Sequence, residues 1–293
     1  MNLYIRFDSA SSGAFTNLHI LGGAEATVNG EPFDAMNETH LMEALKLVKL
    51  PRNVRRGLLK VGFFKPDEPH LGDPNDRVID FTHAIGTPEG DFEPLAPHTV
   101  RARTTANIAV VRNPRKGSMQ FAARASDSWI GVLRVYALGR IQPVAMFFIH
   151  LGRGCVLPRQ GGKSVFETIK QWCLDQELGI VRSELTISGG IGPCCYRFED
   201  ATKLKGEVFA RYGETGERII GKSGDDPRDS FDMHGLIREE FEGVFGKIPE
   251  HLIQVFQEPT FCCACHPAEG SDFALNSQVR SKKTRRDLYL VEV

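Results

Sequence analysis

Apolar residues near the N-terminus follow a helical pattern. Four of them fall at helical spacing before Pro51, namely Leu41, Met42, Leu45 and Leu47. Asn37 or Thr39 can cap the first turn, because a short polar side chain accepts hydrogen bonds from the first free backbone amides of a helix. The pattern therefore predicts a helix that begins at 37 or 39 and ends before the proline.

The middle of the chain has a different pattern, with β-branched and aromatic runs bounded by turn residues. These runs cover residues 108 to 111, 120 to 124, 129 to 136 and 144 to 150. Such composition is typical of strands, so the middle of the chain is predicted to be sheet. Residues 64 to 100 hold six of the sixteen prolines. We expect that stretch to be rich in loops, with one short strand at 77 to 81.

Helices and strands are interleaved in the second half. Ser164 and Glu167 form the pattern of a capping box, and they predict a helix that packs on the sheet. A second helix is expected from Ser230 or Asp232 to about 245, and strands at 184 to 187, 252 to 256 and 288 to 293. This order favours an α/β or α+β class with a mixed sheet. No repeat or low-complexity linker divides the chain, so we expect one domain over residues 1–293.

Charge and cysteine content narrow the function classes. The chain has 36 Lys and Arg against 37 Asp and Glu, a formal charge of -1, which gives no global attraction to nucleic acid or to an anionic membrane. No apolar stretch has the length of a secretory signal or a membrane span. The seven cysteines are odd in number and clustered, which indicates reduced thiols. We expect a cytoplasmic protein that binds neither nucleic acid nor membrane.

The common nucleotide and hydrolase motifs are absent. Gly161 to Ser164 resembles the end of a P-loop, but Leu157 stands at the required earlier glycine. The sequence contains no G-x-G-x-x-G, G-x-S-x-G or H-E-x-x-H pattern.

His150 is the first candidate for chemistry. It ends the apolar run 143 to 149 and is followed by Leu-Gly-Arg-Gly, so it stands where a predicted strand opens into a loop. An imidazole there can bind a metal or move protons, and Arg153 can hold phosphate. The structural alternative is a histidine that caps a strand beside a surface arginine.

The cysteine clusters and a basic segment are further candidates. Cys194 and Cys195 follow glycines and can serve as nucleophile or ligand, although adjacent residues point to opposite sides, so that at most one faces a site. Cys262 to His266 contain one C-x-x-C pair, whereas a structural zinc site with four cysteines needs two. Residues 280 to 286 carry five cations, which form either a phosphate-binding segment or a solvated edge.

Taken in order, these segments resemble the YfiH-like family, which is also labelled the laccase-domain or polyphenol oxidase family. Residues 191 to 196 (I-G-P-C-C-Y) match a segment of the family, and residues 150 to 154 (H-L-G-R-G) are similar to its H-A-G-W-R-G with one residue missing. Residues 125 to 128 (A-S-D-S) stand where the family has T-A-D-C. The tail from Cys262 to Arg286 is similar to its C-T-x-C, S-Y-R-R and T-G-R segments.

The resemblance implies a single four-layer α/β/β/α sandwich with mixed sheets. It also implies a zinc, or less readily copper, site made by two histidines and a cysteine. Here these positions are His150, Ser128 in place of the cysteine, and His83, with His98 as the weaker alternative. A serine hydroxyl is a weaker metal ligand than a thiolate, so the triad is incomplete.

The implied function is that of a purine nucleoside phosphorylase or adenosine deaminase, with a purine nucleoside and phosphate as substrates. His150, Arg153 and Cys194 are the expected catalytic residues, and Arg153, Arg280 and Ser277 the expected phosphate-binding ones. Two other classes stay open. One is a non-catalytic nucleoside-binding or scaffold protein, and the other is a hydrolase in which Cys194 or Cys155 pairs with His150.

Overall fold

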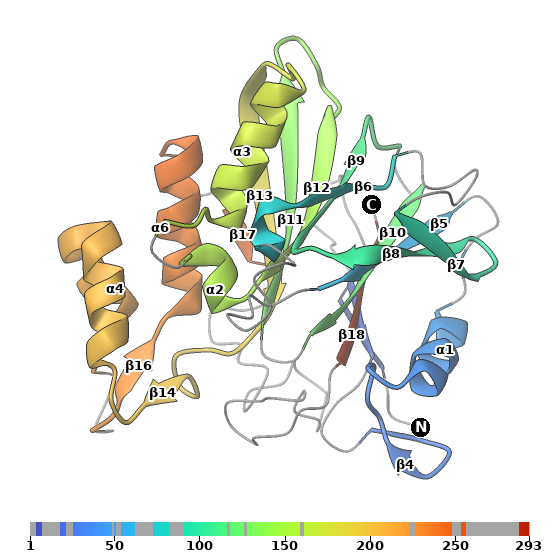
Figure 1. Cartoon of the computed structure of the whole chain (residues 1–293), viewed down its shortest axis with the longest axis horizontal. Coiled ribbons are helices and arrows are strands. Elements are labelled where there is room, and N and C mark those ends of the chain that lie inside the picture. The colour runs from blue at the N-terminus through green and yellow to red at the C-terminus, as the bar shows by residue number, and fades with distance from the viewer. Residues whose placement is uncertain are drawn as a thin grey trace.

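The computed structural model places two mixed β-sheets face to face, with helices on both outer sides (Figure 1). It describes residues 4–7, 18–21, 26–48, 50, 54–61, 73–82, 91–115, 118–125, 128–158, 161–222, 227–247, 253–255 and 287–292.

One sheet has seven strands in the order β1-β2-β18-β10-β5-β8-β7. The strands are β1 (Tyr4–Phe7), β2 (Leu18–Leu21), β18 (Asp287–Glu292), β10 (Met119–Ala125), β5 (Arg55–Lys60), β8 (Thr99–Thr105) and β7 (Phe92–Ala96). Strand β5 is parallel to both β10 and β8, whereas the other pairs are antiparallel.

The other sheet has six strands in the order β17-β13-β11-β12-β9-β6. They are β17 (Ile253–Val255), β13 (Ile180–Gly189), β11 (Trp129–Ala137), β12 (Ala145–Leu151), β9 (Ile108–Arg112) and β6 (Val78–Asp80). The centre is antiparallel and each edge strand is parallel to its neighbour. The two smaller sheets are β3 (Thr27–Val28) with β4 (Glu31–Pro32), and β14 (Arg197–Phe198), β16 (Asp229–Phe231) and β15 (Ile220–Lys222).

Within the described ranges, three apolar cores lie between the four layers. Between the sheets, the rings of Phe121 on β10 and Phe148 on β12 stack with centroids 5.6 Å apart. On the outer side of the six-stranded sheet, Phe147 meets Trp172 of α3 at 5.4 Å. On the outer side of the seven-stranded sheet, Leu58 and Leu290 share a core with Leu41 of α1. The predicted mixed α/β class and the α/β/β/α layering are therefore confirmed.

The helices are α1 (Glu38–Leu47), α2 (Arg153–Val156), α3 (Val165–Asp175), α4 (Thr202–Tyr212), α5 (Gly216–Ile219) and α6 (Met233–Phe245), with two 3₁₀ turns, η2 (Pro74–Asp76) and η3 (Gly213–Thr215). Asn37, not Thr39, caps α1. Ser164 and Glu167 form the predicted capping box of α3. Asp232 caps α6, because Ser230 lies within strand β16.

Two expectations from the sequence are corrected, and one helix was not expected at all. The stretch 64 to 100 contains strand β7 and the start of β8 besides β6, although its prolines indicated loops. Pro94 is tolerated because β7 is the edge strand of its sheet. Strand β13 is longer than the predicted 184 to 187, and α4 was not predicted.

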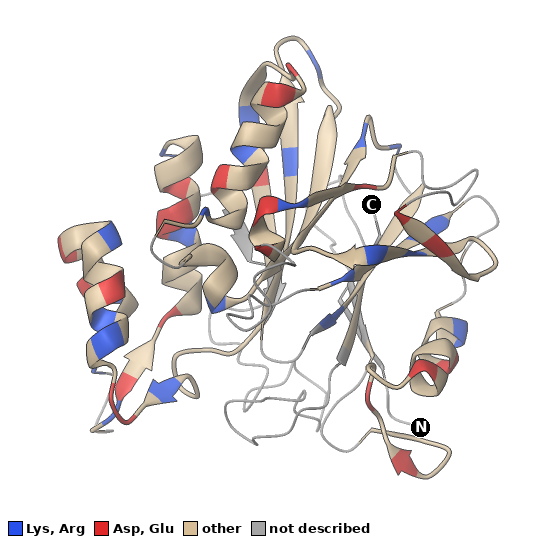
Figure 2. Cartoon of the chain, viewed as in Figure 1, with Lys and Arg blue, Asp and Glu red and all other residues tan. Residues whose placement is uncertain are grey.

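Lys and Arg positions alternate with Asp and Glu positions along the helices (Figure 2). This distribution matches the near-zero net charge of the chain. None of the helices in the described ranges has the length and apolar character needed to cross a bilayer.

Candidate functional site

His150 lies at the end of β12, on the side of the strand that faces the other sheet. Along β12, Met146 and Phe148 enter the core between the sheets, whereas Phe147 and Ile149 face the helices. Because side chains alternate along a strand, His150 points to the same side as Phe148. Its side chain is fully buried, and its backbone amide donates to the Asn107 carbonyl oxygen at 2.9 Å. Two paired strands therefore fix the imidazole in place.

A chain of hydrogen bonds leads from the imidazole ring through two buried asparagine side chains. His150 Nδ1 is 3.2 Å from Asn107 Oδ1. Asn107 Nδ2 donates to Asn75 Oδ1 at 2.8 Å, and Asn75 Nδ2 donates to the Gly154 carbonyl oxygen at 2.9 Å. Asn75 and Asn107 are 3% and 1% exposed, so this chain of polar groups is held away from water. It joins β12 to the residues before β9 and to η2.

Gly152 brings three polar side chains together. A Cβ at this position would lie 3.1 Å from His150 Cε1, 3.5 Å from Ser128 Oγ and 3.6 Å from Cys155 Sγ. The three side chains therefore surround one point at the N-cap of α2. Two of them, His150 and Ser128, are the predicted members of the metal triad, and the structure brings them together.

The Cys155 thiol lies beside the imidazole, with its Sγ 3.5 Å from His150 Nδ1. Burial raises the pKa of this thiol to about 12, and the Asp73 carboxylate adds to the rise, while the Gly152 backbone opposes it. Cys155 is therefore a neutral thiol near pH 7, and it is a weak nucleophile in that form.

Arg153 begins α2 and points outward from the same loop. Its side chain is exposed, and its Cζ lies 5.8 Å from the centre of the Phe198 ring. A guanidinium over an aromatic face is held by a cation–π interaction while its N–H groups stay available to an anion. Arg153 thus adjoins the polar cluster without being buried in it.

The segment from Gly190 to Tyr196 lies beside the start of β11. Trp129 Nε1 donates to the Ile191 carbonyl oxygen at 3.4 Å, and Trp129 directly follows Ser128. Cys194 is exposed, whereas Cys195 packs against the core between the sheets. This division agrees with the expectation that at most one of the adjacent thiols is available for chemistry.

The remaining predicted residues are distributed as follows. His98 lies in the turn between β7 and β8 of the seven-stranded sheet, exposed, with its carbonyl oxygen accepting from Arg56. The other predicted residues lie outside the described ranges, namely His83, Ser277, Arg280 and the cysteines between 262 and 265. Within the described ranges, no three His, Cys, Asp or Glu side chains are grouped to hold a metal ion. The described donors alone therefore do not fit a zinc site.

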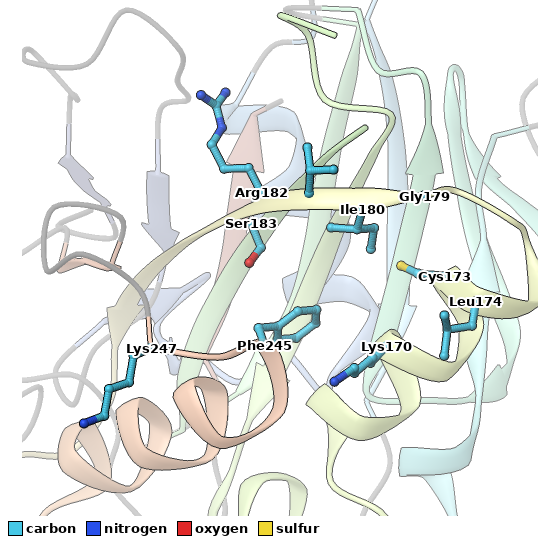
Figure 3. Close-up of a pocket in the computed structure, with 10 residues that line it drawn as sticks. Lys170, Cys173, Leu174, Gly179, Ile180, Arg182, Ser183, Phe245 and Lys247 are labelled. Atoms are coloured by element: carbon cyan, nitrogen blue, oxygen red, sulfur yellow. The ribbon is translucent and has the colours of Figure 1, made fainter. Parts of the chain in front are cut away.

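A separate hollow of about 480 Å³ opens between α3, α6 and the start of β13 (Figure 3). Phe245, Ile180 and Lys170 line it, and Lys170 Nζ donates to the Val244 carbonyl oxygen. Arg182 and Lys247 point away from its centre in this view. None of the predicted site residues that belong to the described ranges lines it.

Solved structures share this fold over nearly their whole length, among them the following three. YlmD from Geobacillus stearothermophilus has a TM-score of 0.63 and 14% identity, and covers 99% of this chain and 96% of its own. The Bacillus licheniformis hypothetical protein YfiH has a TM-score of 0.60 and 12% identity, and the match covers 95% of this chain and 92% of that protein. The Neisseria meningitidis protein NMB0706, of the family DUF152, has a TM-score of 0.60 and 12% identity, and the match covers 100% of this chain and 99% of that protein. The fold is therefore the YfiH-like fold. No family model and no curated protein matches the sequence.

Asn75 and Asn107 are site residues that the sequence analysis missed. They are 32 residues apart and stand in no recognised pattern. The one local signal is the position of Asn107 between Ala106 and the apolar run 108 to 111, where a polar residue enters a buried segment. Only the pairing of β9 with β12 brings it to His150.

Proposed function

We propose that the protein is an enzyme that acts on purine nucleosides, by phosphorolysis or by deamination, at the cluster of His150, Ser128 and Arg153. The observation that carries the proposal is the buried imidazole at the end of β12, with Ser128 and Cys155 converging on Gly152 beside it. The YfiH-like fold and the order of the sequence segments support the same class.

Phosphorolysis asks two things of the site. Phosphate must be held close to C1′ of the ribose, and the purine must gain a proton as its bond to C1′ breaks. Arg153 supplies an exposed guanidinium one residue after Gly152, suited to bidentate contact with phosphate. His150 supplies the group that exchanges the proton with the purine.

Deamination uses the same imidazole differently. A water attacks C6 of the purine, and ammonia leaves. His150 would accept the proton of the attacking water and return one to the leaving amine. His83, which lies outside the described residues, would join His150 in holding a zinc ion if one binds, and the ion would supply a lowered pKa for that water.

A hydrolase built on Cys155 and His150 is the second candidate, favoured by their 3.5 Å separation. Burial, however, raises the pKa of the Cys155 thiol to about 12. A nucleophilic cysteine is normally activated by a lowered pKa, so this thiol has the opposite environment. The nucleoside enzyme is therefore the better-supported proposal.

Product analysis tests the proposal directly. Purified full-length protein would be incubated with adenosine, inosine or guanosine, with and without phosphate and with and without zinc, and the products separated by chromatography. Free base with ribose 1-phosphate indicates phosphorolysis, and inosine from adenosine indicates deamination. Saturable binding of a nucleoside without any product would replace the enzyme proposal with the nucleoside-binding one. If the protein forms no product and binds no nucleoside, both the enzyme proposal and the nucleoside-binding proposal are refuted.

A further inference from the structure

The two buried amides next to His150 have only one arrangement that satisfies their hydrogen bonds. Asn75 faces the carbonyl oxygen of Gly154, and a carbonyl only accepts, so the Nδ2 group of Asn75 must lie on that side. This leaves Asn75 Oδ1 toward Asn107, which must present its own Nδ2. Asn107 Oδ1 is then the atom that meets the imidazole.

Because Asn107 Oδ1 only accepts, His150 Nδ1 must carry a proton. In the neutral ring the lone pair then lies on Nε2. The backbone restrains this arrangement at both ends, since the amide of Asn107 donates to the Pro74 carbonyl oxygen at 3.1 Å and that of Asn75 donates to Asp73 Oδ1 at 2.8 Å. Neither asparagine can turn over without breaking a buried hydrogen bond.

We propose that Asn107, oriented by Asn75, is a positioning residue that holds His150 in the Nδ1–H tautomer and so makes Nε2 the atom that exchanges protons or binds an electrophile. The consequence for function rests on the proposed nucleoside chemistry. The tautomer itself does not, because it follows from the hydrogen bonds alone.

The same arrangement explains why Cys155 is not a partner for a base. Its Sγ approaches His150 on Nδ1, the nitrogen that already carries a proton. That nitrogen cannot accept the proton of the thiol. Cys155 and Asn107 thus border the Nδ1 edge of the ring.

Nitrogen-15 NMR of full-length protein labelled at histidine measures the tautomer without any activity assay. Comparison with His150→Ala assigns the His150 signals among the nine histidines. We expect a protonated-type signal at Nδ1 and a non-protonated-type signal at Nε2 above the pH at which the ring becomes neutral. The reverse pattern, or an equal mixture, in the wild-type protein would overturn the proposal, and this result needs no variant that has to fold.

Variants then test the role of the amide. Asn107→Asp removes the donor to Asn75 Oδ1 but keeps an acceptor toward the ring, so it should keep the Nδ1–H pattern. Asn107→Leu should shift the ring toward Nε2–H. Asn113→Gly, at the other end of β9, is the control, because glycine accepts the positive φ of 46° at that exposed position. An unchanged tautomer in a folded Asn107→Leu protein would contradict the inference. If Asn107→Leu does not fold, Asn75→Leu, which frees the Asn107 amide to turn, replaces it.

Kinetics separate this inference from the proposed function. Loss of a hydrogen bond that orients a functional histidine typically costs about 10 to 100-fold in activity. We expect this loss for Asn107→Leu in kcat, with KM little changed, and recovery in Asn107→Asp. A wild-type Nδ1–H tautomer without any nucleoside turnover would refute the proposed function and leave the positioning role intact. Nucleoside turnover together with an Nε2–H tautomer would support the proposed function and refute the positioning role of Asn107.

Discussion

Gly190 lies directly against the indole of Trp129, so that a Cβ at Gly190 would overlap the five-membered ring. Gly190 also has a φ of 89°, which side chains rarely adopt. The two features fix where the segment 190 to 196 passes the start of β11. That segment carries Cys194 and the Ile191 carbonyl oxygen that accepts from the Trp129 indole.

Replacement of Gly190 by alanine should therefore destabilise the fold for two reasons. Backbone strain in this region costs about 1–3 kcal/mol, and overpacking adds about 1–3 kcal/mol. Urea unfolding measures the sum. Gly139→Ala is the matched control, because Gly139 has a φ of 72° with no atom within 4 Å of its Cβ position. Equal losses in the two variants would show that the contact with Trp129 is unimportant.

Gly152→Ala should lower activity more than stability. The new methyl group would press on His150 Cε1 and lie in contact with Ser128 and Cys155, and a displaced catalytic group commonly costs about 10²-fold when it moves by about 1 Å. We expect kcat/KM to fall by at least about 10-fold. Gly154→Ala, two residues on, has no atom within 4 Å of its Cβ position and should leave the rate unchanged. Equal rates for both variants would place the chemistry elsewhere.

The cysteines should differ in reactivity in the folded protein. Cys194 is exposed, whereas burial raises the pKa of Cys155 and of Cys173 to about 12. At pH 8, iodoacetamide followed by peptide mass spectrometry should label Cys194 first and leave Cys155 and Cys173 unmodified until the protein unfolds. Cys155→Ala should retain nucleoside turnover. Rapid labelling of Cys155 together with lost turnover would revive the hydrolase candidate.

Glu240 of α6 accepts hydrogen bonds from α4 on the outer face of the six-stranded sheet. Arg211 at the end of α4 donates to it at 2.9 and 2.5 Å, Tyr212 donates at 2.6 Å, and Arg211 also pairs with Glu167 of α3 at 3.0 Å. Burial acts to raise the pKa of Glu240, but the hydrogen bonds from Arg211 and Tyr212 outweigh it and hold the pKa below its usual 4.5.

A carboxyl group whose pKa is lower in the folded than in the unfolded state stabilises the fold at pH values above its unfolded pKa. This stabilisation is lost as the pH falls through the folded pKa. Glu240→Gln should therefore cost about 1–3 kcal/mol at pH 7, because hydrogen bonds to a charged group are lost. The difference from the wild type should shrink as the pH is lowered below 4.5. Denaturant unfolding at pH 7 and pH 3.5 measures it, and a difference that grows on acidification would refute the assignment.

Sequence patterns predicted the elements whose signals are local. Helices α1 and α3 begin with side-chain caps, Asn37 and Ser164, and the central strands are β-branched or aromatic runs. Helix α4 has no side-chain cap, and only Leu204 and Val208 of it are buried, so its sequence has a weak amphipathic pattern. Such a helix depends on contacts made by the rest of the fold, for example Arg211 with Glu240.

The candidate site was predictable only in part for the same reason. His150, Ser128 and Arg153 stand in segments that resemble family motifs, and the structure brings the first two together around Gly152. Asn75 and Asn107 act through a chain of hydrogen bonds between distant segments, which no spacing along the sequence shows. The roles of His83, Ser277 and Arg280 remain predictions.

Turnover by the His150→Ala protein tests the central claim most directly. Product formation from adenosine and from inosine, with phosphate, would be compared for the wild type, His150→Ala and His98→Asn, which alters an exposed histidine of the other sheet and suits its φ of 60°. We predict that the wild type and His98→Asn form product at equal rates, and that His150→Ala loses at least about 10²-fold, the scale of a general acid–base contribution. Full turnover by His150→Ala would contradict a catalytic role for the buried imidazole.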